Sequence, residues 1–163
     1  MRAAEPSEIG PLARLWYDAW QDAHAQILPA ALTRLRTLES FRERLHAALP
    51  RTRVVGPPAA PSGFCIVKGD ELYQLFVAAH ARGSGVAAAL IADAEARLFE
   101  DGVPIAWLAC AIGNERAARF YEKCGWRRAG TMVSRLETAE EIFPLEVWRY
   151  EKRLTRASEP KAL

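Results

Sequence analysis

Residues 75–87 read Leu-Phe-Val-Ala-Ala-His-Ala-Arg-Gly-Ser-Gly-Val-Ala. An apolar run is followed by a loop of small residues and then by apolar positions at helical spacing (86, 90, 91, 94 and 98). This order predicts a strand, a glycine turn and the start of a helix. The first N–H groups of a helix have no partner within the helix, and Gly83 and Gly85 let the backbone approach a ligand closely, so the turn is suited to bind an anion such as a pyrophosphate.

The glycine turn fits some pyrophosphate ligands better than others. Residues 83–88 match the G-x-G-x-x-A pattern of dinucleotide-binding folds, but in those folds the first glycine ends the strand and an acid closes the next strand. Here a five-residue loop intervenes, and the apolar run 103–112 contains no acid. The Gly-Lys-Ser/Thr of a phosphate-binding P-loop is absent. A different pyrophosphate ligand remains, with an ordinary helix start as the alternative.

Upstream of this turn the sequence predicts helices. Apolar residues recur at helical spacing over 9–23 behind a cap at Ser7, and a short helical stretch follows at 30–36. A capping box of Ser40 and Glu43 then begins another helix.

The remaining patterns predict a sheet. Gly69-Asp70 suits a type II′ hairpin turn, and Asn114 is expected to cap a helix that ends at Gly125. Strands are expected at 54–55, 64–67, 71–77 and 105–111, twice more between 126 and 154, and as a residual strand at 1–4.

A helix joins strands 71–77 and 105–111, so these two should run parallel, with a right-handed crossover, while the other strands pair antiparallel. The expected fold class is α/β, with a mixed, mostly antiparallel open sheet flanked by helices. We expect one domain over 1–154, followed by a polar tail at 155–163.

Composition excludes several classes of protein. The 163 residues are 50% hydrophobic and 26% charged, which is ordinary globular composition. The formal net charge of +2 offers no global field for nucleic acid or an anionic membrane, so neither partner is expected. The three cysteines have no zinc-binding spacing, and no metal is expected. The first residues lack the apolar core of a signal peptide, so the expected location is cytoplasmic.

Two sequence blocks resemble the Gcn5-related N-acetyltransferase (GNAT) family. The family signature Gln/Arg-x-x-Gly-x-Gly/Ala is matched by Arg82, Gly85 and Ala87. A second block, Asn-x-x-Ala-x-x-Phe-Tyr-x-x-x-Gly-Phe, is matched over residues 114–126, with Trp126 in place of the last Phe. The resemblance covers roughly residues 52–154, and it implies the acyl-CoA N-acyltransferase fold with a splayed parallel strand pair at its centre.

The resemblance also implies acetyl-coenzyme A (acetyl-CoA) as cosubstrate. Its pantetheine arm would insert between the splayed strands and take main-chain hydrogen bonds from the first of them, while the helix start would hold the pyrophosphate. Asn114 would hydrogen-bond the arm or the phosphates in addition to capping its helix. The implied cosubstrate-binding residues are Leu75, Phe76, Val77, Arg82, Gly83, Ser84, Gly85, Val86, Ala87 and Asn114.

Catalytic roles follow by the same resemblance. Tyr121 would donate a proton to the leaving thiolate, although by pattern alone it belongs to an apolar helix face. A primary amine has a pKa about 3.4 units above pH 7, so a proton acceptor is needed, and Glu71 or a water chain would serve. Trp20 and His24, on the first helix, would wall the acceptor site.

The expected function is therefore direct transfer of the acetyl group from acetyl-CoA to the primary amine of a small molecule in a ternary complex. The alternatives are a protein or aminoacyl-tRNA amine as acceptor, and a non-catalytic module that binds acyl-CoA. Members of this fold often dimerise, so the resemblance admits a homodimer.

Overall fold

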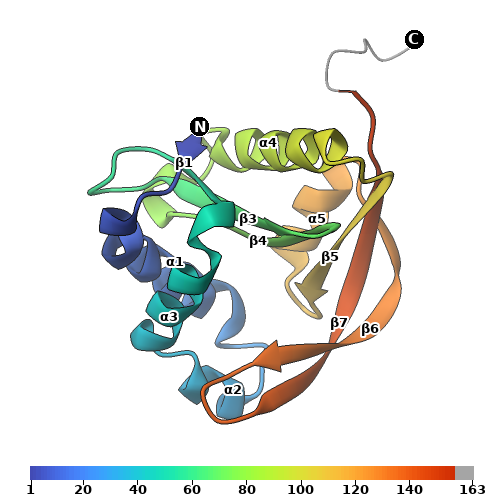
Figure 1. Ribbon diagram of the computed structural model, residues 1–163. Helices are drawn as coiled ribbons and strands as arrows, with labels where there is room; N and C mark the ends of the chain where they lie inside the picture. The colour runs from blue at the N-terminus through green and yellow to red at the C-terminus, as the bar shows by residue number, and fades with distance from the viewer. Residues whose placement is uncertain (157–163) are drawn as a thin grey trace.

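The structure, a computed structural model, describes residues 1–156 and places one sheet between two groups of helices (Figure 1). Most of the predicted tail, 157–163, lies outside the described residues. The helices are α1 (Ile9–His24), α2 (Ala30–Leu35), α3 (Leu38–Ala48), α4 (Val86–Glu100) and α5 (Glu115–Lys123). The strands are β1 (Arg2–Ala3), β2 (Thr52–Val55), β3 (Gly63–Lys68), β4 (Glu71–Val77), β5 (Ile105–Ala111), β6 (Arg127–Glu137) and β7 (Ile142–Arg153).

The sheet has seven strands in the order β1-β2-β3-β4-β5-β7-β6. Only β4 and β5 pair in parallel, and every other described pair is antiparallel. The mixed, mostly antiparallel open sheet predicted from the sequence is confirmed. Within residues 1–156, no helix is long and apolar enough to cross a membrane.

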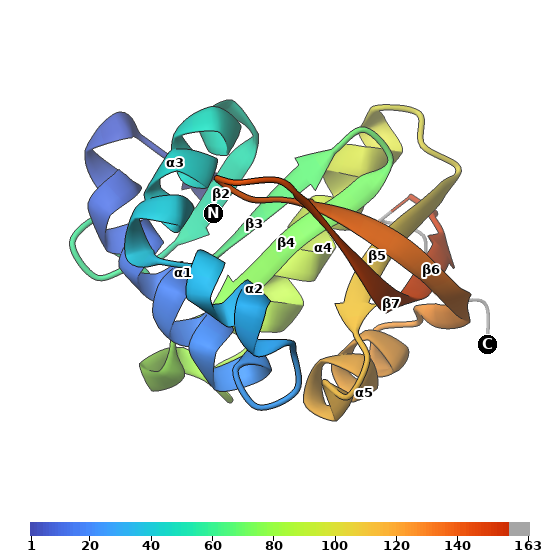
Figure 2. The ribbon, with the colours of Figure 1, turned by 90° about the horizontal axis from the view of Figure 1, so that it is seen from below.

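Separate hydrophobic clusters form on the two faces of the sheet. One joins α4 and α5 to the sheet through residues such as Leu90, Leu98 and Tyr150. The other joins α1 and α3 through Trp16 and Phe41, whose ring centroids lie 5.0 Å apart. Figure 2 shows the two groups of helices on opposite sides of the strands. Burial of these faces is the main source of stability expected for a domain of this size.

The helix starts differ from those predicted. Ser7 does not cap α1; instead the main-chain N–H of Glu5 donates to the buried Glu8 carboxylate (2.8 Å), which Arg2 also binds. The capping box predicted at Ser40 is also wrong, because α3 begins at Leu38 and Thr37 Oγ1 accepts from the Ser40 amide (3.1 Å). At α3 the Thr37 hydroxyl thus takes the place of the predicted cap, whereas the Glu5–Glu8 bond belongs to the 3-10 turn Pro6–Glu8 that precedes α1.

The Gly69-Asp70 hairpin is confirmed between β3 and β4, with Gly69 at a positive φ of 61°. Within this hairpin the register shifts: Ile66 pairs with Gln74, whereas Val67 pairs with Leu72. Tyr73 is therefore the extra residue of a β-bulge, a device that re-aims side chains and bends a strand.

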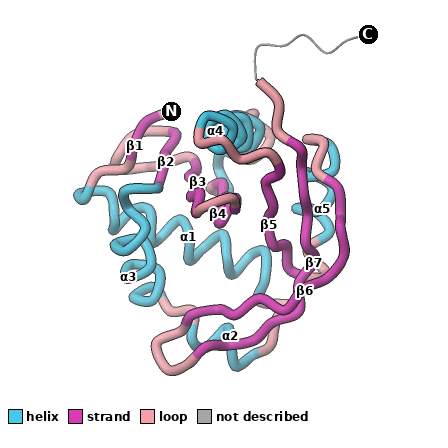
Figure 3. Tube along the Cα trace, turned by 45° about the vertical axis from the view of Figure 1, so that its right-hand side comes forward, coloured by secondary structure: helices cyan, strands magenta, loops and turns pink. Residues whose placement is uncertain are grey.

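The parallel pair is held at one end only. Its single recorded register position is Glu71 opposite Trp107, and the Trp107 amide donates to the Asp70 carbonyl (3.2 Å). Beyond that point no register position joins β4 and β5, and the trace in Figure 3 shows β5 standing apart from β3 and β4. The predicted splay is confirmed, and it opens a gap in the centre of the sheet.

Candidate functional site

The glycine turn presents free amides at the start of α4. Gly83 and Gly85 have positive φ values of 78° and 85°, and Gly85 is the N-cap residue with no side-chain hydrogen bond over the helix start. The first helical hydrogen bond to this cap comes from Ala89, so the amides of residues 86–88 precede it. They point out of the helix end, where the helix dipole favours negative charge.

Both glycines leave open space on the side where a Cβ would project. A Cβ added at either position would meet no heavy atom within 4 Å, and the backbone of the turn is accessible from outside. A pyrophosphate needs such an approach, so the residues present fit this part of coenzyme A.

Two other residues of the predicted signature behave differently. The Ser84 hydroxyl turns back and donates to the Ala81 carbonyl, and Ser84 does not line the adjoining cleft. Arg82 lines that cleft, and its guanidinium also bridges to Asp22 of α1 (3.2 Å), which ties the turn to the first helix. Of the predicted cosubstrate-binding residues, Ser84 is thus the one that does not line the cleft.

The cleft beside the turn, here called the outer cleft, has a volume of about 460 Å³. It extends from the start of α4 into the gap between β4 and β5, and α5 forms its far wall. It is lined by nine of the predicted residues: Leu75, Phe76, Val77, Arg82, Gly83, Gly85, Val86, Ala87 and Asn114.

Asn114 caps α5 as predicted, and its side chain is placed for the ligand contact that was also predicted for it. Its Oδ1 accepts from the Ala117 amide (3.3 Å) and so caps α5. Its side chain also faces the cleft, and the amide nitrogen has no hydrogen-bond partner among residues 1–156. A ligand carbonyl or phosphate in the cleft can therefore accept from it.

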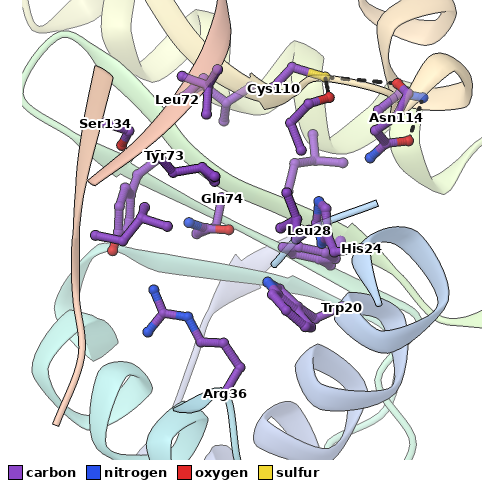
Figure 4. A pocket seen from close by; sticks show the side chains of 18 of the residues that line it. Trp20, His24, Leu28, Arg36, Leu72, Tyr73, Gln74, Cys110, Asn114 and Ser134 are labelled. Carbon is purple, nitrogen blue, oxygen red and sulfur yellow. Dashed lines mark hydrogen bonds between the residues drawn. The ribbon is translucent and has the colours of Figure 1, made fainter. Parts of the chain in front are cut away.

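A second cavity, here called the inner pocket, lies on the α1 side of the gap (Figure 4). Its volume is about 160 Å³, and its walls come from α1, α2, β4, β5 and the β6–β7 hairpin. Glu71, Trp20 and His24, the residues predicted to serve the acceptor, all line it.

The outer cleft and the inner pocket meet at a shared wall. The residues that line both cavities are Leu75, Phe76, Asn114, Ala117 and Tyr121. These residues come from β4 and α5, on the two sides of the splay. A ligand in one cavity can therefore touch a ligand in the other only at this wall.

Tyr121 stands at the shared wall with its hydroxyl unpaired among the described residues. Burial is the main cause that raises the pKa of its phenol above the ordinary value, with further contributions from Cys110 and Cys124. The phenol is therefore fully protonated at neutral pH, and its proton is available to a base that forms beside it.

Glu71 has the electrostatics of a general base. Its burial in the inner pocket raises the pKa of its carboxyl to about 7, while Lys68 opposes this shift and Asp70 adds to it. A base is most effective when its pKa lies near the working pH, and Glu71 meets that condition.

His24 is a poor candidate for the same role. Burial lowers the pKa of its imidazole to about 4, so the ring is neutral at physiological pH. The ring packs against Trp20, with centroids 5.2 Å apart, and against Phe76 at 6.2 Å. Its position supports the predicted wall of the acceptor site rather than proton transfer.

Sequence reasoning missed several polar residues of the inner pocket. Arg36, Arg44 and Tyr73 line it, and none belongs to a recognisable motif. Tyr73 reaches the pocket as the bulged residue of β4, and Arg36 as the residue that ends α2. The only signal available was that Arg44 borders the apolar face of the third predicted helix.

The architecture resembles the acyl-CoA N-acyltransferase fold, and comparisons with known proteins agree with this likeness. Residues 60–126 match the Acetyltransferase (GNAT) family. An uncharacterised N-acetyltransferase of Mycobacterium tuberculosis is 35% identical over 80 residues, which are 47% of this chain and 51% of that protein. The chain thus spans about half the length of the curated relatives it matches.

Solved structures share the fold over nearly the whole chain. A GCN5-related N-acetyltransferase from Rhodopseudomonas palustris superposes with a TM-score of 0.74 at 20% identity, covering 94% of each chain. The PaiA N-acetyltransferase of Thermoplasma acidophilum, solved in complex with coenzyme A, gives 0.63 at 16% identity over 93% of this chain and 96% of that one.

A ribosomal-protein-alanine N-acetyltransferase from Brucella melitensis gives a TM-score of 0.64 at 19% identity, covering 94% of this chain and 98% of that one. Residues 60–126 are therefore similar to the GNAT family, and the solved structures show that the whole chain shares the fold of N-acetyltransferases.

Proposed function

We propose that this protein is an N-acetyltransferase that moves the acetyl group of acetyl-CoA to the primary amine of a small molecule. The observation that carries the proposal is the shared wall, which joins a cleft suited to a pyrophosphate to a pocket lined by Glu71, whose carboxyl has a pKa of about 7. Direct transfer requires two substrates to meet at one point, and the shared wall is such a point.

The outer cleft would hold acetyl-CoA, which supplies an activated acetyl thioester. The amides of residues 86–88 would bind its pyrophosphate, and the free edge of β4 at Leu75–Val77 would pair with its pantetheine amides as a strand partner does. Asn114 would add a side-chain donor from α5.

The inner pocket would hold the acceptor amine. The amine nitrogen attacks the thioester carbonyl carbon, the new C–N bond forms, and the C–S bond breaks. The ammonium form of the acceptor first loses one proton to Glu71, which frees the attacking amine. Tyr121 gives its phenol proton to the departing sulfur, and the second proton lost by the nitrogen restores the phenol through pocket water. Glu71 lies four residues before Leu75, about 13 Å along an extended strand, so we expect water in the pocket to relay the proton to it.

A covalent route through cysteine is disfavoured. Cys110 is the cysteine that lines the inner pocket, and burial raises the pKa of its thiol to about 12. Only a thiolate is an effective nucleophile, and the thiolate is scarce at neutral pH when the pKa is so high. Iodoacetamide is therefore expected to leave activity intact at pH 7.

Small acceptors are favoured over protein amines because the inner pocket has a volume of only about 160 Å³, with α2 and the β6–β7 hairpin among its walls. Two experiments test the proposal. Acetyl-CoA should raise the melting temperature by linkage while NAD does not, and coenzyme A release should be seen with a panel of small amines. Equal shifts with both nucleotides would refute the assignment of the outer cleft, and acetyl-CoA binding without turnover of any amine would favour a non-catalytic module.

A further inference from the structure

Arg36 is a buried cation in the inner pocket. Its side chain is only 3% exposed, and in Figure 4 its guanidinium points toward Tyr73 and Gln74. Nη1 donates to the main-chain carbonyl of Glu137 (2.8 Å), and among residues 1–156 this is the only hydrogen bond of the group. Of the ion pairs formed by these described residues, none includes Arg36.

A second cation lies beside it. Arg44 of α3 lines the same pocket, donates to the Tyr73 hydroxyl (3.1 Å) and stacks on Trp16 with its guanidinium carbon 4.4 Å from the ring centroid. Burial and, to a smaller extent, repulsion from Arg44 lower the pKa of Arg36 to about 10. Arg36 still carries its positive charge at neutral pH.

The other titratable groups of the pocket do not neutralise this charge. His24 is neutral, and Tyr121 is a protonated phenol at neutral pH. The charges that act on Glu71 are those of Lys68, Asp70 and Arg149, and Glu71 forms no ion pair with either arginine of the pocket. A buried charge without a partner is strongly unfavourable, so Arg36 needs an anionic partner, which an occupant of the pocket would supply.

We propose that the acceptor is a primary amine that also carries a carboxylate, and that Arg36, assisted by Arg44, binds this carboxylate. The proposal rests on the proposed acetyltransferase function. A guanidinium offers parallel N–H donors that match a planar carboxylate. In Figure 4, Trp20, Leu28 and His24 lie between Arg36 and Asn114. An amino acid can therefore lie along these apolar walls with its amine at the shared wall.

The first test compares matched acceptors. β-Alanine, 4-aminobutyrate and the common α-amino acids are assayed against their own carboxamides, which keep the amine and the skeleton and lose the charge. The best carboxylate should exceed its carboxamide in kcat/KM by on the order of 10- to 100-fold, the scale of a hydrogen-bonded charge. Equal use of the two series overturns the inference while leaving the acetyltransferase function in place.

The second test changes the arginine. Arg36→Met should raise KM for the carboxylate by on the order of 10-fold or more and leave KM for acetyl-CoA unchanged. It should lower kcat/KM for the carboxamide much less, because a neutral amide loses only a weaker hydrogen bond. Arg36→Lys keeps the charge and should recover part of the loss. Arg34→Met is the matched control, because Arg34 is an exposed residue of the same helix. Equal effects of Arg36→Met on both acceptor series would contradict the inference.

A binding measurement covers the case in which Arg36→Met does not fold or no acceptor turns over. With coenzyme A present, calorimetry on the wild-type protein should detect N-acetylated amino acids but not their amides. If neither series binds, or both bind equally, the inference is wrong. Failure of acetyl-CoA to bind at all would instead overturn the proposed function.

Discussion

Tyr121 and Glu71 are buried in the same region, and burial raises the pKa of both groups with different chemical results. For Tyr121 the shift keeps the proton on the phenol at every physiological pH. For Glu71 it brings the pKa to about 7, so the carboxylate is ionised only partly at neutral pH and can exchange protons there. One physical cause, removal from water, thus leaves a protonated phenol and a partly ionised carboxylate in one pocket at neutral pH.

Tyr121→Phe should separate catalysis from folding. The change removes one oxygen that has no hydrogen-bond partner among residues 1–156 and keeps the ring that packs near Trp126 and Tyr150. Stability should therefore change by less than about 1 kcal/mol, whereas kcat should fall by roughly 10² or more. Tyr17→Phe, on α1 outside both cavities, is the control. A Tyr121→Phe enzyme within about threefold of wild-type kcat would exclude the phenol as the acid.

Glu71→Gln should change the pH profile. In the wild type, kcat/KM should fall as the pH drops through about 7, because Glu71 then becomes protonated. The variant should lack this limb, and its deficit should be largest above pH 7. Glu43→Gln, an exposed change on α3, is the control. If the variant keeps the wild-type profile, water alone removes the proton.

Glu71 should also affect stability, with the opposite dependence on pH: activity rises as the carboxyl ionises, whereas the stability of the folded protein falls. The folded-state pKa of Glu71 is raised from about 4.5 to about 7, so the wild type loses stability as the pH rises through that window. The melting temperature of Glu71→Gln relative to wild type should therefore increase between pH 4.5 and pH 8. Thermal unfolding across this range measures it, and a constant difference would show that the side chain is solvated.

At the scale of elements, α4 carries a left-handed glycine at each end. Gly85 at its start and Gly102 after its end have φ values of 85° and 82°, and an added Cβ meets no atom at either site. Gly85→Ala and Gly102→Ala should therefore each cost about 1–2 kcal/mol of backbone strain. Only Gly85→Ala should also weaken acetyl-CoA binding, measured by calorimetry. Equal affinities in the two variants would mean that the turn does not approach the pyrophosphate.

Features set by a few neighbouring residues could be predicted from the sequence, whereas features set by contacts between residues far apart in the chain could not. The Gly69-Asp70 hairpin follows from two adjacent residues, and the α4 and α5 starts from short motifs. The Tyr73 bulge depends on how β4 pairs with β3, which no local pattern encodes. Arg36 is buried in part by contact with Glu137, 101 residues away. The position of Arg36 in the inner pocket therefore depends on the β6–β7 hairpin lying against α2, and no local sequence pattern predicts that contact.

At the scale of the molecule, the splay divides the sheet into halves that touch through one end of β4 and β5. Acetyl-CoA bound between them should slow hydrogen exchange at the amides of 75–77 and 86–88, because these are the groups it pairs with. The tip of the β6–β7 hairpin, residues 138–141, should exchange unchanged and serves as the internal control. Protection spread evenly over the chain would argue for general stabilisation rather than binding in the gap.

The shared wall has a thermodynamic consequence. Leu75, Phe76, Asn114, Ala117 and Tyr121 border both cavities. A ligand that fixes the conformation of these side chains in one cavity also fixes it for a ligand in the other. If acetyl-CoA tightens the hold on the amine by some factor, the amine must tighten the hold on acetyl-CoA by the same factor. With such coupling, the affinity measured for either substrate alone would understate how strongly the pair is held together.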